Sequence, residues 1–210
     1  FRGKIADELF PLIMTEGFGF DVEILYLAVK RNLNILEVPI DWHHRTASKV
    51  RNATDSLLML WETILIRWRN LHGHYEANFS FAHSMPDSRS GDQAFHSNQE
   101  NLVAVVMPTY NEAKNLREAT HRIFAQKIPN LYIIVVDDNS TDGTSQISRE
   151  LSEHFPRTLH FIRRRTKQGL GTAYIEGFSQ ALASKADYIF QMDADLSHSP
   201  EYIPTFLNML

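Results

Sequence analysis

Cysteine is absent from the 210 residues of this chain, which excludes a disulfide framework and thiol chemistry and is compatible with the cytosol. Long apolar runs are also absent: none approaches the roughly 20 residues that span a bilayer, and no signal peptide is recognisable. Basic residues are not in excess, because the net charge is -4, and the composition does not favour nucleic-acid binding. Ten histidines are present, but His43-His44 and His72-x-His74 form no ligand cluster and are interpreted as solvated. With 43% hydrophobic residues, the chain has the composition of an ordinary globular protein.

A pair of carboxylates, Asp193 and Asp195, directly follows the apolar run 188–192. A run of this length predicts a buried strand, and ligands of open α/β sheets bind where such strands end. Side chains two residues apart on an extended backbone project to the same side, so the pair offers hard oxygen ligands to Mg²⁺ or Mn²⁺. The alternative is an Asp-rich turn in which Asp195 caps a helix that begins near Pro200.

A parallel α/β sheet is predicted upstream of this pair. The apolar runs 102–107 and 131–136 and the short segment 159–162 predict further strands, and the segments between them have helical periodicity, the first from Asn111 onwards. Alternating strands and helices indicate a doubly wound parallel sheet. Its strand ends carry a set of polar side chains that should cluster at one edge: Tyr110, Glu112, Asp138, Asp193 and Asp195.

Four motifs in this order, MPTYNEAKNL, VVDDNSTDGT, KQGLGTAYIEG and MDADLSHSP, resemble the nucleotide-sugar half of an inverting family 2 glycosyltransferase. Within that family they most resemble the dolichyl-phosphate mannose synthases and the bacterial polyprenyl-phosphate sugar synthases. The resemblance implies a Rossmann-like GT-A fold and a Mg²⁺ or Mn²⁺ ion on Asp193 and Asp195. Some relatives have a further Gln ligand where this chain has Ser197. The resemblance also implies a nucleotide-sugar site made of Pro108, Tyr110, Glu112, Val136, Asp138, Asp193, Ala194 and Asp195.

Other interpretations of these motifs stay open at this point. Pro108 and Tyr110 fit a turn that ends a strand, and Asp138 fits an Asx-turn or a helix cap. Gly169 and Gly171 fit a tight turn and close helix packing better than a phosphate cradle. The basic loop 163–167 either faces the sugar diphosphate or is a solvated charged loop.

Residues 1–75, the N-terminal part, resemble the C-terminal third of the same superfamily, most closely the dolichyl-phosphate glucosyltransferase type. The matching stretches are GFGFDVEILYLA, EVPIDWHHR, ASKVR and SLLMLWETILIRWRNLHG, with an expected strand over 34–42. The resemblance places Arg45 and Lys49 near the donor diphosphate or the lipid phosphate, as catalytic residues beside Asp193 and Asp195; a solvated turn is the alternative.

The last helix of the N-terminal part has an apolar stripe. We expect a core face, with contact to a membrane surface as the second interpretation because Arg67 and Arg69 flank the stripe. The stripe consists of Leu57, Leu60, Trp61, Ile64, Leu65 and Trp68.

The order of the two parts is reversed relative to an intact enzyme of this family. Residues 76–100 are polar and predict a flexible linker. Residues 101–210, the C-terminal part, resemble the first half of a module. We therefore expect an incomplete α/β fold in two parts: the end of one glycosyltransferase module, a linker, and the beginning of a second. A second account is that the two parts dock as one permuted domain.

The expected activity is transfer of mannose or glucose from GDP-mannose or UDP-glucose to a polyprenyl or dolichyl phosphate, at the cytoplasmic face of a membrane. The alternative is a fragment that binds the nucleotide sugar without turnover. A nucleotidyltransferase would favour a Gly-rich loop with Lys after the first strand, which PTYNEAKN lacks, and a plain interaction domain would not need acidic strand ends. With a hydroxyl acceptor, Asp21 or Glu23 would be candidate bases.

Overall fold

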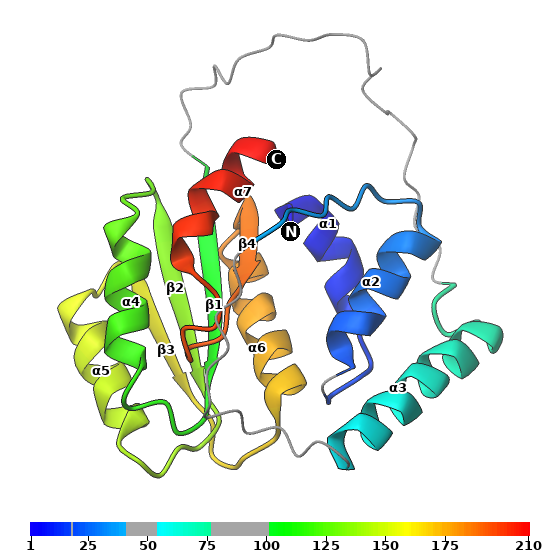
Figure 1. The fold of residues 1–210 in the computed structure, drawn as a ribbon, viewed down its shortest axis with the longest axis horizontal. Coiled ribbons are helices and arrows are strands. Elements are labelled where there is room, and N and C mark those ends of the chain that lie inside the picture. The colour runs from blue at the N-terminus through cyan, green and yellow to red at the C-terminus, as the bar shows by residue number, and fades with distance from the viewer. Residues whose placement is uncertain (18, 41–53, 77–100) are drawn as a thin grey trace, which may run out of the picture.

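The computed structural model describes residues 1–17, 19–40, 54–76 and 101–210, and Figure 1 shows their arrangement. Its centre is a four-stranded parallel sheet in the order β3-β2-β1-β4. In the register of the sheet, Val103 pairs with Leu131 on one side and with Tyr188 on the other. The strands are β1 (Val103–Thr109), β2 (Leu131–Asp137), β3 (Leu159–Arg163) and β4 (Tyr188–Gln191). All four predicted strands and their parallel arrangement are confirmed.

Helices cover both faces of the sheet (Figure 1). Because side chains alternate along a strand, Val103 and Val105 pack on one face and Ala104 and Val106 on the other. The first face is covered by α4 (Leu116–Ala125), α5 (Thr144–His154), and the short η2 (Pro200–Tyr202) with α7 (Ile203–Met209). The second face is covered by α6 (Leu170–Ala183), and beyond it lie α1 (Gly3–Leu9), η1 (Phe10–Leu12), α2 (Phe20–Lys30) and α3 (Thr54–Leu71).

The N-terminal part packs directly on the C-terminal part. One hydrophobic cluster contains Phe10, Phe20 and Ile24 from the former and Ala104 and Phe178 from the latter, all buried. At the edge of the sheet, Phe1 exchanges two backbone hydrogen bonds of 2.8 Å with Ile189 of β4. The two parts therefore share one core, which is the arrangement that the second account of the chain order requires. Nearly all of the predicted linker, residues 77–100, lies outside the described residues.

A buried carboxylate fastens α2 to its surroundings. Glu23 is completely buried, and its Oε2 accepts hydrogen bonds from the backbone N–H groups of Met14 (2.9 Å) and Thr15 (2.7 Å). Its Oε1 accepts from the hydroxyl of Tyr75 and lies 3.4 Å from Nη1 of Arg69. Burial, together with the neighbouring Glu23, raises the pKa of Tyr75, which keeps this phenol a donor. Glu23 is thus fully engaged, so its candidacy as a general base is wrong.

The N-terminal part corrects two further expectations. Residues 34–40 form no strand, and Ile35 and Leu36 are exposed there; Asp41 and Trp42 lie outside the described residues. The stripe on α3 is not a core face, because Leu57, Trp61 and Trp68 are each at least half exposed. Ile66, which the stripe did not include, is the α3 residue that enters the core, with 2% of its surface exposed.

The helix predicted from Asn111 begins five residues later, at Leu116. Asn111 has a φ of 57°, in the left-handed region. Its N–H donates to Oγ of Ser140 (2.9 Å), and its Oδ1 accepts from the N–H of Thr141 (2.9 Å). These contacts with the β2–α5 loop hold Asn111 in a turn, which the local apolar periodicity could not reveal. Within the described residues, no helix is both long and apolar enough to cross a membrane.

Candidate donor-binding site

The loops that follow β1 and β2 are joined by hydrogen bonds at the carboxyl edge of the sheet. The backbone N–H of Glu112 donates to Oγ1 of Thr144 (2.8 Å), and the N–H of Ala113 donates to Asp142 (3.1 Å). Asp137, completely buried, accepts from the hydroxyls of Ser140 and Ser145 and so shapes the β2–α5 turn. Sequence reasoning gave Asp137 no role, although Asp with Ser three residues later is a recognisable turn signal.

Asp138 is buried and holds the loop between β3 and α6. Its carboxylate accepts from the N–H groups of Gln168 and Gly169, both at 2.8 Å, and from Nη1 of Arg164 at 3.0 Å. Arg164 also contacts Glu176 at 2.8 Å, so within the basic loop this guanidinium is buried and paired rather than solvated. The structure therefore presents Asp138 as a support of the loop above it.

Gly169, which ends this loop, and Gly171, in the first turn of α6, confirm the expected tight turn and close helix packing. Gly169 has a φ of +103° and directly precedes α6. A Cβ on Gly171 would lie 2.6 Å from the carbonyl oxygens of Glu16 and Gly17, so the absent side chain lets the N-terminal part approach α6. Nearby, Nζ of Lys167 lies 3.7 Å from the centre of the Tyr110 ring, a cation–π contact.

The acidic pair follows β4 as predicted. Oδ1 of Asp193 accepts a 2.7 Å hydrogen bond from the hydroxyl of Tyr174, and Nδ1 of His198 lies 4.0 Å from its Oδ2. Oδ1 of Asp195 accepts from the N–H of Ser197 at 2.9 Å. Asp195 thus closes a two-residue turn and does not cap the helix at Pro200, whose preceding residue is Ser199.

The N-terminal part adds a carboxylate that sequence reasoning considered only as a base. Oδ1 of Asp21, at the start of α2, accepts a 2.7 Å hydrogen bond from Nε2 of Gln191 at the end of β4. Desolvation by surrounding atoms raises the pKa of Asp21, and the charge of Asp193 acts in the same direction. Only the packing of the two parts reveals this neighbour, because 170 residues separate Asp21 from Gln191.

Negative charge accumulates around Asp193. Burial raises the pKa of Asp193, and the charges of Asp195 and Glu112 raise it further, against the lowering effects of Tyr174 and His198. Carboxylate oxygens are the ligands that a hard divalent cation prefers, and such a cation would relieve the repulsion between these carboxylates. The residues fit such an ion, although in the described part of the chain no three His, Cys, Asp or Glu side chains are already gathered closely enough to hold one.

The structure brings together some predicted site residues and not others. Glu112, Asp193 and Asp195 interact electrostatically at the sheet edge, and Tyr110 and Ala194 belong to the same loops. Pro108 and Val136 are buried within the strands; a Cβ on Gly177 would lie 3.3 Å from Val136, so Val136 faces α6 and not an open site. Arg45 and Lys49 lie outside the described residues.

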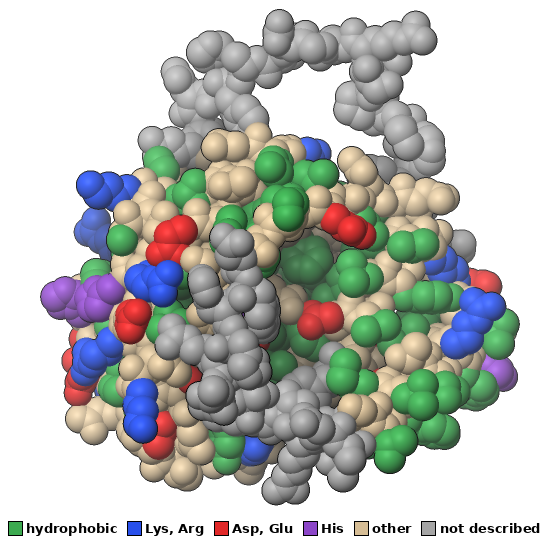
Figure 2. Space-filling model, in the orientation of Figure 1, with side chains coloured by type: hydrophobic (Ala, Val, Ile, Leu, Met, Phe, Trp, Pro, Cys, Tyr) green, Lys and Arg blue, Asp and Glu red, His purple; other side chains and the backbone are tan. Residues whose placement is uncertain are grey.

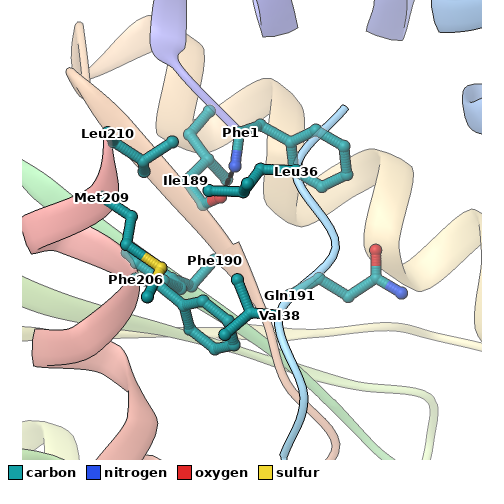
Figure 3. A pocket seen from close by; sticks show the side chains of 9 residues that line it. All are labelled: Phe1, Leu36, Val38, Ile189, Phe190, Gln191, Phe206, Met209 and Leu210. Atoms are coloured by element: carbon teal, nitrogen blue, oxygen red, sulfur yellow. Dashed lines mark hydrogen bonds between the residues drawn. The ribbon is translucent and has the colours of Figure 1, made fainter. Parts of the chain in front are cut away.

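An apolar groove of about 260 Å³ runs along β4 (Figure 3). Figure 3 shows Leu36 and Val38 on one side and Phe206 and Met209 on the other. The groove reaches the acidic cluster only through Gln191, so it is separate from the candidate donor site.

Comparisons with known proteins match the C-terminal part. The model of "Glycosyl transferase family 2" matches residues 104–210. Polyprenol monophosphomannose synthase of Mycolicibacterium smegmatis is 40% identical over 104 residues, which are 50% of this chain and 39% of that protein. Dolichol-phosphate mannosyltransferase of Pyrococcus furiosus is 43% identical over 109 residues, which are 51% of this chain and 30% of that protein. The chain therefore spans about 30% to 39% of the length of these two relatives.

Among solved structures, the mannosyltransferase PcManGT of Pyrobaculum calidifontis, in complex with GDP-Man and Mn²⁺, is similar with a TM-score of 0.40 and 26% identity. The alignment covers 67% of this chain and 37% of that one. The family model extends from the second residue of β1 to the last residue of the chain, over half of its length. The four-stranded parallel sheet with flanking helices and the polar edge described above lie within this match. The chain belongs to glycosyl transferase family 2.

Proposed function

We propose that this chain is part of an enzyme that transfers mannose or glucose from a nucleotide sugar to a polyprenyl or dolichyl phosphate. Two relatives at 40% and 43% identity, named for polyprenol and dolichol phosphate mannose transfer, support this assignment. The observation that carries it is the acidic edge of the sheet, where Asp193 and Asp195 follow β4. The charge of Glu112, in the loop after β1, raises the pKa of Asp193 at this edge.

Asp193 and Asp195 are the residues that would hold a Mg²⁺ or Mn²⁺ ion. When bound, such an ion neutralises the charge that develops on a leaving nucleoside diphosphate. The raised pKa of Asp193 supports this role, because a cation would relieve the repulsion that raises it. Ser197 is buried and its N–H holds Asp195, so a side-chain ligand at that position is not part of the proposal.

The other proposed site residues have different roles, which depend on where they lie. Glu112 and Tyr110 stand in the loop after β1, where a nucleoside would meet them. Asp138 would act through the Gln168–Gly169 backbone that it holds in place. Pro108, Val136 and Ala194 shape this edge, and Arg45 and Lys49 are proposed to approach the phosphates.

A phosphate acceptor removes the need for a strong general base. Its oxygen is largely ionised near pH 7, since the second pKa of a phosphate monoester is about 6, and it can attack the anomeric carbon directly, with inversion. This agrees with Glu23 being committed to the fold. Asp21, beside Gln191, is the base candidate that remains for a hydroxyl acceptor.

We also propose that the chain contacts a membrane surface through α3. At about 100° per residue, six exposed side chains of α3 fall within an arc of roughly 100°, opposite the buried Ile66. Arg67 is exposed beside this arc, and Glu62 is turned inward, where it accepts from the N–H of Gly19 at 2.7 Å. Figure 2 shows hydrophobic side chains gathered over this region. A broad apolar face without an outward carboxylate suits an anionic lipid surface. The six residues are Leu57, Leu60, Trp61, Ile64, Trp68 and Leu71.

Calorimetric titration tests the donor site. GDP-mannose and UDP-glucose are each added to the chain with and without Mn²⁺, and then to the variants Asp195→Asn and Asp7→Asn. Asp7 is an exposed carboxylate on α1 and serves as the matched control. We expect Mn²⁺-dependent binding of one nucleotide sugar, weakened at least about tenfold by Asp195→Asn and unchanged by Asp7→Asn.

Three results of this titration have separate meanings. Binding without sugar transfer to a polyprenyl phosphate would favour the second candidate, a nucleotide-sugar-binding fragment without turnover. Equal binding by both variants would contradict the proposed metal residues. No binding by the folded wild-type chain would contradict a formed donor site on these residues.

A further inference from the structure

Four aromatic rings form a ladder across the contact between the two parts. Phe10 of η1 stacks on Phe178 of α6 at 4.1 Å between centroids, and Phe178 stacks on Tyr174 at 5.6 Å. Phe20 of α2 also stacks on Tyr174, at 5.1 Å between centroids and with an interplanar angle of 26°. The ladder therefore begins and ends in the N-terminal part, and α6 supplies its two middle rings.

The ladder has one polar atom, and this atom faces the acidic pair. Tyr174 is 1% exposed, and its hydroxyl donates to Oδ1 of Asp193 at 2.7 Å. Phe20 and Phe178 both stack against this buried ring, so the phenol has little freedom to turn away. A hydrogen bond from such a fixed donor selects one orientation of the carboxylate.

We propose that Tyr174 is a positioning residue for the donor site, and that Phe20 of the N-terminal part holds it in place. This inference rests on the proposed function, because it concerns the Asp193 carboxylate assigned to the metal. The hydroxyl fixes Oδ1 and leaves Oδ2 of Asp193, which lies 4.0 Å from Nδ1 of His198, available to a metal ion. The N-terminal part thereby controls the geometry of the carboxylates proposed to bind the metal, Asp193 and Asp195, which lie in the C-terminal part.

Preorientation of a ligand is measurable as metal affinity. Loss of a group that orients a metal ligand lowers affinity by roughly 10- to 100-fold in characterised sites. A residue that only fills the core would change the unfolding midpoint and leave the affinity of the folded chain unaltered. Affinity measured on folded chain therefore separates positioning from packing.

The test compares two substitutions that each remove one buried phenolic hydroxyl. Tyr174→Phe keeps the ring and the ladder. Tyr132→Phe is the matched control, since Tyr132 is also buried in the same cluster but its hydroxyl faces the carbonyl oxygen of Ala181 at 3.5 Å. Mn²⁺ is titrated without nucleotide by electron paramagnetic resonance, and circular dichroism verifies folding. We expect Tyr174→Phe to weaken Mn²⁺ binding by roughly 10-fold or more and Tyr132→Phe to leave it unchanged.

A second variant tests the role of the N-terminal part. Phe20→Leu keeps an apolar side chain but removes the ring that stacks on Tyr174, and we expect it to weaken Mn²⁺ binding. In the double variant, adding Tyr174→Phe should weaken binding no further, because both substitutions remove the same positioning effect. If the wild-type chain binds Mn²⁺ and both single variants bind it equally well, the positioning role is overturned while the proposed function stands. If the folded wild-type chain binds no Mn²⁺, both proposals are overturned.

Discussion

At the scale of single residues, the surroundings of Asp193 disfavour its ionised form when no cation is bound. Its pKa is raised above the usual 3.8 by burial, Asp195 and Glu112. A raised carboxyl pKa means that the folded chain binds this proton more tightly than the unfolded chain, so folding stability falls as the pH rises from 3.8 through the raised pKa. The Asp193→Asn variant escapes this loss, and its amide oxygen can still accept from Tyr174.

We therefore predict that Asp193→Asn stabilises the metal-free chain at pH 7 by a few tenths of a kcal/mol, roughly 1 °C in melting temperature. Below pH 3.8 the carboxylate is protonated in both states, and the difference should disappear. Thermal unfolding at the two pH values measures both effects. A variant less stable than wild type at pH 7 would show that the hydrogen bond of the carboxylate outweighs the repulsion.

At the scale of elements, α3 presents an arc of apolar side chains that no described element covers. We predict that the chain binds vesicles containing anionic phosphatidylglycerol and that tryptophan emission shifts to shorter wavelength on binding. Trp61 and Trp68, two of the three tryptophans, lie on the exposed arc. Ile64→Glu should weaken binding roughly tenfold because it places a carboxylate in that arc.

The adjacent substitution Thr63→Glu is the matched control, since Thr63 is exposed on α3 but lies outside the arc. It introduces the same charge and should leave vesicle binding close to the wild-type value. Equal effects of the two substitutions would indicate attraction by net charge alone. If the chain does not bind vesicles but self-associates, the arc would instead be a contact between two copies of the chain.

At the scale of the whole molecule, we expect the shared core to make the two parts one cooperative unit. Phe10 is 5% exposed, and its ring stacks on Phe178 of the C-terminal part. We predict that Phe10→Ala lowers the free energy of unfolding by about 3–5 kcal/mol and that both parts unfold in the same transition. Hydrogen exchange during urea unfolding reports on the two parts separately.

Ile123→Ala, in the cluster on the opposite face of the sheet, provides the comparison. With one cooperative unit it should also shift exchange in both parts, by about 2–5 kcal/mol. If Phe10→Ala affected exchange in residues 1–76 alone, the two parts would be independent domains despite their contact.

Much of the C-terminal part could be predicted from the sequence by itself. The strands could be predicted because β1 and β2, covered by helices on both faces, are buried at every residue and therefore almost continuously apolar, and shorter segments of the same kind gave β3 and β4. The same runs placed Glu112, Asp193 and Asp195 at one edge, because the carboxyl ends of parallel strands lie together. The four motifs indicated the family that the comparisons confirm over residues 104–210.

The tertiary structure decided which way individual side chains face and what covers them. Val136 and Asp138 lie two residues apart at a predicted strand end. Val136 packs against α6, whereas the carboxylate of Asp138 accepts hydrogen bonds from Arg164 and two backbone N–H groups. The α3 stripe has the period of a core helix, but no described element covers it. Asp21 and the ring of Phe20 reach the acidic edge only because α2 docks on α6. Local periodicity reports whether a segment can bury a face, whereas the partner of that face depends on contacts between residues far apart in the chain, and these no local pattern contains.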